Sequence, residues 1–262
     1  MRALHTAATG MAAQELNVQV ISNNIANMRT TGYKRQRAEF QDLLYEHVSR
    51  VGTQTSTQGN ILPVGIDLGG GVKTVGTPRI MTQGTLLPTG KDFDVAIRGE
   101  GFFKILRPDG TYAYTRDGSF QMDAQGRVVT PQGNVLQPGI TIPQNSTSIT
   151  INMQGQVSAI VPGSTTPTVL GQITLTRFVN KSGLQAVGDN LFIETPASGT
   201  PQDTPPGTDG IGDLQQGNLE QANVEAVTEI SDLISAQRAY EMNSKVISAA
   251  DQMLQATANL MR

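Results

Sequence analysis

The residues that could act as nucleophiles, bases or metal ligands are few and scattered along this chain of 262 residues. Cysteine is absent, which excludes thiol catalysis, disulfides and cysteine-bound metals. The two histidines, His5 and His47, have no second histidine or carboxylate at metal-ligand spacing in the local sequence. Serine is plentiful, but it never occurs in a Gly-x-Ser-x-Gly nucleophile elbow. We therefore expect no enzyme, no catalytic residue, no metal and no cofactor.

Three short stretches bear a superficial likeness to ligand sites. Asp92 and Asp94 would share one face of a strand and could hold a cation, although a solvated strand edge or a turn explains the pair as well. The glycines of LGGGVK, 68–73, lack the Gly-Lys-Ser/Thr ending of a phosphate loop and indicate a flexible extended arm. The stretch 116–126 lacks the Asp-x-Asp-x-Asp-Gly pattern and the closing glutamate of a calcium loop, and it predicts a hairpin.

The densest polar chemistry is a row of amides, Asn23, Asn24 and Asn27, near the end of a predicted helix. Asparagine is a poor interior helix residue because its amide competes for nearby backbone groups. The spacing places these amides on one side of the helix. They could hydrogen-bond to neighbouring helices, or they could only fray and cap this end. The segment 30–32 would then close the helix, since Gly32 suits a left-handed cap.

These amides belong to one of two helices predicted at the two ends of the chain. From residue 3 to about 28, and from about 222 to 261, apolar residues recur in steps of three and four. The predicted coiled-coil face consists of Leu4, Met11, Val18, Ile21, Ile25, Ile230, Leu233, Ile247 and Leu254. Polar residues interrupt the two stripes at Gln14, Gln237, Ser244 and Asp251, and buried polar seam residues set register. Two ordinary amphipathic helices packed on a globular core remain the alternative to a coiled coil.

Between these helices the sequence predicts β structure. Residues 93–195 contain short β-branched and aromatic runs separated by turn signals such as Pro108-Asp109-Gly110, which indicates an inserted, mostly antiparallel β domain. Residues 36–92 and 196–220 are expected to form an extended connecting arm, and residues 1–35 and 221–262 a discontinuous helical domain. The predicted class is therefore α+β.

Charge and hydropathy indicate which partners and locations the sequence does not favour. A net charge of −3 gives no basic field for nucleic acid. No apolar run has the length of a secretory signal core or of a membrane span, so we expect no membrane insertion. Composition alone would indicate a cytosolic protein.

The stretch NNIANMRTTGYKRQ changes this interpretation, because it resembles the N-terminal signature of bacterial flagellar axial proteins, the rod and hook family. The residues that carry the resemblance are Asn24, Ile25, Ala26, Asn27, Thr30 or Thr31, Gly32, Tyr33 and Lys34. The stretch EISDLISAQRAYEMNSKVISAADQMLQ resembles the partner signature through Gln237, Arg238, Ala239, Tyr240, Asn243, Lys245 and Asp251. Family members often have threonine where this chain has Ala250. DVAIRGEGFFKI and YTRDGSFQMDAQGRVVTPQGNVLQ resemble the core that rod and hook proteins share.

The resemblance implies a structural subunit that polymerises helically into a hollow drive shaft, transmits torque from motor to hook and serves as an export channel. Chain length and the arm at 50–92 favour the distal rod class; a proximal rod or hook-type subunit is the alternative. A peptidoglycan-acting enzyme fits less well, since 93–195 contains only the glutamates Glu100 and Glu194.

The implied partners are further copies of this chain, proximal rod proteins, the hook protein, the surrounding P- and L-ring bushing and the type III flagellar export apparatus. The implied location is the rod of the flagellar basal body, where it spans the periplasm. Export without a cleaved signal peptide would replace the cytosolic interpretation.

Overall fold

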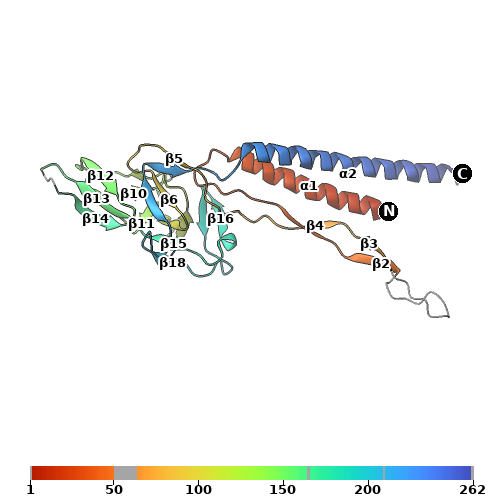
Figure 1. The fold of residues 1–262 in the computed structure, drawn as a ribbon, viewed down its shortest axis with the longest axis horizontal. Helices are drawn as coiled ribbons and strands as arrows, with labels where there is room; N and C mark the ends of the chain where they lie inside the picture. Colours follow the sequence, from red (N-terminus) through yellow and green to blue (C-terminus); the bar gives the residue numbers. More distant parts are fainter. Residues whose placement is uncertain (1, 50–63, 164–165, 209, 261–262) are drawn as a thin grey trace. The chain divides into compact units, whose positions relative to one another are not determined.

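The computed structural model describes residues 2–49, 64–163, 166–208 and 210–260, and the chain divides into two compact units (Figure 1). The described parts of 1–25, 36–78 and 225–262 form the first unit, and those of 26–35 and 79–224 form the second. Long helices and antiparallel strands confirm the α+β class. Residues 26–35, which were predicted with the helices, belong to the second unit, because Gly32, Lys34 and Arg35 bond to segments of that unit. The predicted arm is not a unit of its own, since the described residues of 36–78 belong to the first unit and those of 79–92 and 196–220 belong to the second.

The two helices of the first unit, α1 (Arg2–Ala26) and α2 (Ala226–Leu260), lie side by side (Figure 1). Asn24 Nδ2 donates to Glu229 Oε2 at 3.1 Å, while Gly10 lies against the amide of Asn243. These contacts are 14 positions apart on both helices and run in opposite directions along the sequence, so the helices are antiparallel. Neither helix, over its described residues, is apolar enough to cross a membrane.

Several of the buried residues on the two helices are small. Ala7 and Ala13 on α1 and Ala236 and Ala250 on α2 are buried. The predicted face is placed unevenly in the single chain: Ile21 is buried, Leu4, Met11, Val18, Ile25, Leu233 and Ile247 are half-buried, and Ile230 and Leu254 are exposed.

The polar members of the predicted stripes also lie in different places. Gln14 is half-buried and accepts from Asn17 Nδ2 at 3.5 Å, whereas Gln237, Ser244 and Asp251 are exposed. A role of these three residues in setting register therefore stays a prediction about an assembled state. The last predicted position of the C-terminal helix, residue 261, lies outside the described residues.

The remaining part of the first unit consists of two antiparallel strand pairs. β1 (Glu39–Asp42) pairs with β4 (Val72–Gly76), and β2 (Tyr45–Ser49) pairs with β3 (Ile66–Gly69). The LGGGVK stretch thus continues a strand ladder, since Leu43 N–H donates to Gly71 O and Gly70 N–H donates to Leu44 O. Residues 50–63 of the predicted arm lie outside the described residues.

The second unit carries the β structure. Its strands are β5 (Leu86–Pro88), β6 (Val95–Arg98), β7 (Phe102–Leu106), β8 (Tyr112–Thr115), β9 (Gln121–Met122), β10 (Val128–Val129), β11 (Val135–Gln137), β12 (Ser148–Ile151), β13 (Gln156–Ile160), β14 (Thr168–Gln172), β15 (Leu175–Arg177), β16 (Gln185–Gly188), β17 (Leu191–Ile193), β18 (Gln202–Thr204), β19 (Asp213–Gln216) and β20 (Asn218–Glu220). A 3-10 helix, η1, spans Lys181–Gly183.

Among the described residues these strands form a nine-stranded sheet, a three-stranded sheet and two pairs. The largest sheet follows the order β16-β17-β8-β7-β11-β10-β9, with β15 joining β7 and β18 joining β15. β12, β13 and β14 form the smaller sheet, while β19 pairs with β6 and β20 pairs with β5. The hairpin predicted at 116–126 lies a few residues later in the chain, where β9 pairs with β10 in antiparallel register across 121–129.

The core of the second unit is apolar and mostly aliphatic. Ile97, Phe103, Leu136, Ile173 and Leu175 are among its fully buried members. A second cluster is aromatic: Phe178 lies edge-on to both Phe102 and Tyr114 at ring-centroid distances of 6.0 and 4.7 Å. This packing fixes β7 and β8, and residue 116 directly follows β8.

Candidate functional site

The N-terminal signature begins in the last turn of α1 and continues into a turn beyond the helix. Helix α1 ends at Ala26, and Asn27 then organises the turn by accepting from Thr30 Oγ1 at 3.2 Å. Gly32 has a φ of +67°, so its predicted left-handed conformation is present, but it lies six positions beyond the helix and is not its cap. A Cβ on Gly32 would lie 2.6 Å from the backbone nitrogen of Asp117. The turn therefore requires glycine for both conformation and space.

The asparagines divide between the two predicted roles. Asn24 is buried, donates to Glu229 across the helix pair, and exchanges two hydrogen bonds with the backbone of Gln36 at 2.9 and 3.0 Å. Asn27 serves the local turn, and Asn23 is on the exposed side. A single amide thus ties the end of α1 to the first turn of α2 and to the chain that returns after the turn.

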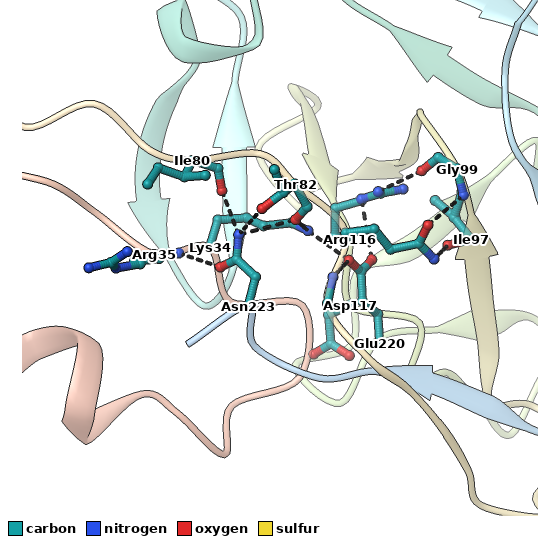
Figure 2. Close-up of polar contacts among 12 residues, drawn as sticks. Lys34, Arg35, Ile80, Thr82, Ile97, Gly99, Arg116, Asp117, Glu220 and Asn223 are labelled. Carbon is teal, nitrogen blue, oxygen red and sulfur yellow. Dashed lines mark hydrogen bonds and ion pairs between the residues drawn. The ribbon is translucent and has the colours of Figure 1, made fainter. Parts of the chain in front are cut away.

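In the second unit, Lys34 and Glu220 form the centre of a buried ionic cluster (Figure 2). Lys34 Nζ donates to Glu220 Oε1 at 2.7 Å and to Thr82 O at 2.8 Å. The other carboxylate oxygen lies 3.3 Å from Nε of Arg116, whose Nη2 donates to Gly99 O at 2.7 Å. Glu220 also accepts from Gly84 N–H at 2.9 Å. We call Lys34, Arg116 and Glu220 the ionic cluster.

A second polar side chain, Asn223, fastens the backbone next to this cluster (Figure 2). Its Oδ1 accepts from Arg35 N–H at 2.7 Å, and its Nδ2 donates to Ile80 O at 2.8 Å and to Thr82 O at 3.1 Å. The backbone adds Gly32 N–H to Glu220 O at 2.8 Å. Three segments distant in sequence, around residues 32–35, 80–84 and 220–223, are therefore joined by hydrogen bonds to their backbones.

Burial controls the electrostatics of the ionic cluster. Desolvation is the largest influence on Lys34 and lowers its pKa, with the Glu220 carboxylate opposing it and Arg116 adding to it. The pKa of Arg116 is lowered for the same reason, again against the attraction of Glu220. Two cations thus share one carboxylate in a region removed from water, which is costly unless every charge is well paired.

The C-terminal signature residues do not gather into one site in the single chain. Gln237 and Arg238 are exposed, and Tyr240 is 44% exposed. Asn243 is half-buried because its amide fills the space above Gly10. Of the N-terminal signature, Ile25, Asn27, Thr30 and Tyr33 are half-buried, Ala26 is exposed, and Asn24, Gly32 and Lys34 are buried.

The least exposed polar contacts of the site involve residues that the sequence did not single out: Glu220, Arg116, Asn223 and Glu229. Glu220 closes a three-residue strand, and Arg116 stands before an Asp-Gly turn, where charged residues are usually solvated. No local spacing distinguishes a glutamate that will be buried against a lysine 186 positions away.

The described part of the chain contains no cluster of metal-ligating side chains. No three acidic or histidine side chains there are arranged to hold a metal ion. Asp94 is buried and belongs to a β-bridge with Ser119, while Asp92 is exposed in a turn closed by Asp94 N–H to Lys91 O, so the turn alternative is present and the solvated strand edge is not. Glu100 pairs with Lys181, and His47 pairs with Asp67 at 2.6 Å.

Family models match three parts of the chain. Residues 4–34 match the model described as flagella basal body rod protein, residues 96–159 match the flagellar hook protein FlgE/F/G D1 domain, and residues 215–260 match the flagellar basal body rod FlgEFG protein C-terminal. Lys34, Arg116 and Glu220 come from one match each, so the ionic cluster joins the three matched segments.

Relatives that match the whole chain are also flagellar basal-body rod proteins. A flagellar basal-body rod protein FlgG of Caulobacter vibrioides is 58% identical over 99% of both chains. The proteins of that name from Borreliella burgdorferi and Bacillus subtilis are 49% and 36% identical, over 100% of this chain and 99% and 100% of theirs. The similarity extends from the helices through the β strands.

Proposed function

The chain belongs to the FlgG family of flagellar basal-body rod proteins, and from this premise we propose how it builds the rod. It is a structural subunit of the distal rod and not an enzyme, and it polymerises with other rod components. The finer proposal is that α1 and α2 pair as a coiled coil, that this pair lines a hollow tube, and that the second unit forms the outer wall.

The observation that carries the proposal is a set of large apolar residues on α2 that the single chain leaves exposed. Val227, Ile234, Met242 and Met253 are 77%, 45%, 61% and 64% exposed, and we call them the outer stripe. At about 100° per residue, Val227 and Ile234 lie roughly half a turn from the side that carries Glu229 and Ala236. Met242 lies about 100° from Asn243 and Met253 about 60° from Ala250, so the outer stripe turns toward the α1-facing side along the helix. A helix with apolar residues on both sides is suited to burial between two neighbours.

Polymerisation supplies the missing neighbour. Exposed apolar groups contribute about 25 cal/mol for each Å² that a second subunit covers. A head-to-tail contact that does not close generates a helical filament, which is the form a rod needs. We propose that α2 of each copy packs its outer stripe against the helices of the next copy, with Gln237, Arg238 and Tyr240 beside this contact.

Membership of the FlgG family also supports a proposal about where the rod lies and what it joins. We propose that the rod crosses the periplasm inside the P- and L-ring bushing, joins proximal rod proteins to the hook protein, transmits torque and provides the export channel. We also propose export by the type III flagellar apparatus without a cleaved signal peptide. The absence of cysteine from the sequence suits passage into an oxidising compartment.

Complementation of a deletion strain tests the helical part of the proposal. Removal of residues 1–30 takes away α1 and should abolish both export and assembly. Ile234→Asp puts a charge on the outer stripe and should allow export but block assembly, since the aspartate is solvated only in the free subunit. Val179→Asp is the control, because Val179 is 84% exposed but belongs to the second unit. Normal rods from either helix variant would refute the proposed contact.

A further inference from the structure

A cavity of about 170 Å³ lies beside the ionic cluster, inside the second unit. Lys34, Arg116 and Lys181 supply cationic side chains to its wall, and Glu100, Gly99 and Phe102 lie among the other wall residues. A single water needs about 10–15 Å³ of such space, so the cavity is large enough for a small polar ligand.

Positive charge is in excess around this cavity. Lys34, Arg116 and Lys181 stand against the carboxylates of Glu220 and Glu100, and the first of these carboxylates is already shared by two cations. Lys34 is 1% exposed and Arg116 is 4% exposed, so water does not screen them fully. A buried net charge without a counter-ion is costly, and an anion in the cavity would remove that cost.

Arg116 offers a donor for such an anion. Its Nε faces Glu220 and its Nη2 bonds to Gly99 O, as Figure 2 shows. Its Nη1 is buried and has no hydrogen-bond partner among the residues that the structure describes. A guanidinium normally uses its donors in a planar fork that matches the two oxygens of a carboxylate. The Arg116 guanidinium also lies over the ring of Phe102 at 5.9 Å, which holds its plane in place.

We propose that this cavity is a carboxylate-binding site, in which Arg116 supplies the inner donor and Lys181 the cationic rim. The carboxylate is either that of a small organic anion or that of an acidic side chain of a second copy of the chain. Lys181 suits the rim because its side chain is 25% exposed and lies in η1, while Glu100, its partner, is 56% exposed. The site goes beyond the proposed rod function, because binding by the single chain does not depend on assembly.

Acetate is the probe, and the full-length chain in its monomeric form is the target. Backbone amides of Gly99 and Gly101 lie in the cavity wall, so glycine-selective ¹⁵N labelling reports on the site directly. Sodium acetate is titrated at constant ionic strength, with sodium chloride as the balancing salt. Both signals should move along one saturable curve, while Gly110, which is not in the wall, should stay unchanged.

In three variants the proposal predicts the direction in which the affinity for acetate changes. Lys181→Gln should weaken acetate binding about tenfold, the usual effect of losing one charge-assisted hydrogen bond. Glu100→Gln removes the competing rim carboxylate and should tighten binding. Lys104→Gln, which removes a lysine paired with Asp203 outside the cavity, should leave binding unchanged. A general salt effect would not weaken binding in one rim variant and strengthen it in the other.

The source of the carboxylate is decided by assembly in vitro. If a second copy supplies it, acetate should inhibit assembly, and Glu100→Gln should make the inhibition more sensitive to acetate. If a free anion supplies it, acetate should bind the monomer and leave assembly unchanged. Absence of a saturable shift at Gly99 and Gly101, or equal behaviour of the Lys181 and Glu100 variants, would overturn the proposal while leaving the rod function intact.

Discussion

Lys34 and Glu220, 186 positions apart in the chain, form a buried ion pair with 2.7 Å between Nζ and Oε1. Their side chains are 1% and 0% exposed. The pair connects the end of the N-terminal signature to the strand that precedes α2, and Arg116 attaches both to the β structure of the second unit. The segment that leads into the terminal helices is therefore fixed by charge pairing as well as by apolar packing.

Glu220→Gln should be strongly destabilising. The substitution leaves Lys34 and Arg116 buried without their counter-charge, and breaking a buried pair in this way costs about 3–5 kcal/mol. The free energy of unfolding of the full chain, measured in urea, gives the loss. Lys104→Gln breaks a more exposed pair and should cost less than about 1 kcal/mol. Similar losses in the two variants would contradict the role of the cluster.

Gly32→Ala should cost more than an ordinary left-handed glycine does. The new Cβ would meet the backbone of Asp117 at 2.6 Å, and backbone cannot rotate away, so we expect a loss of about 3 kcal/mol or more. Gly110→Ala is the matched control, because Gly110 has a φ of +79° and nothing within 4 Å of the new Cβ. It should lose only about 1–2 kcal/mol in the same urea experiment. An equal cost at both positions would show that the turn at Gly32 can relax.

The effect of Gly10→Ala on stability should depend on Asn243 and should reverse in sign when Asn243 is replaced by alanine. Alanine raises helix propensity by about 1 kcal/mol, but its Cβ would lie 2.9 Å from Nδ2 of Asn243 and displace that amide. In the Asn243→Ala background the clash is gone, and the substitution should stabilise the helix pair. A double-mutant cycle on helix content during thermal unfolding measures the coupling. Additive effects would place Asn243 away from α1.

Because the phenol of Tyr114 is buried, we expect the protein to lose stability at alkaline pH. Burial, followed by the Glu194 carboxylate, raises the pKa of its phenol above the usual value of 10.0. Above pH 10 the unfolded chain therefore binds fewer protons than the folded chain, and the free energy of unfolding falls as pH rises. Urea unfolding at a series of pH values measures the slope, which should be smaller in Tyr114→Phe. An unchanged slope in this variant would assign the alkaline loss to other groups.

The sequence was sufficient for the features that local periodicity and turn chemistry determine. The steps of three and four residues predict both helices, and the Asp-Gly and Gln-Gly turns predict the hairpins. It was harder to predict which face of α2 packs against α1, because the outer stripe and the α1-facing side both contain apolar residues. Ala236 and Ala250 are buried whereas the larger Ile230 is 49% exposed, so hydrophobicity does not identify the buried side of this helix.

The ionic cluster could not be predicted for a different reason. Glu220, Arg116 and Asn223 acquire their roles only when β20, the end of β8 and the segment after α1 are brought together. A buried charge has no periodicity, and polar residues in short strands and turns are usually solvated. The signature showed that Lys34 belongs to a family pattern, but not which carboxylate neutralises it.

Electron microscopy of basal bodies from a strain that lacks this gene tests the central claim most directly. The account predicts basal bodies that end in a short proximal stub without a hook, and restoration of the full rod by the wild-type chain. Normal basal bodies that carry hooks would contradict the assignment of this chain to the distal rod.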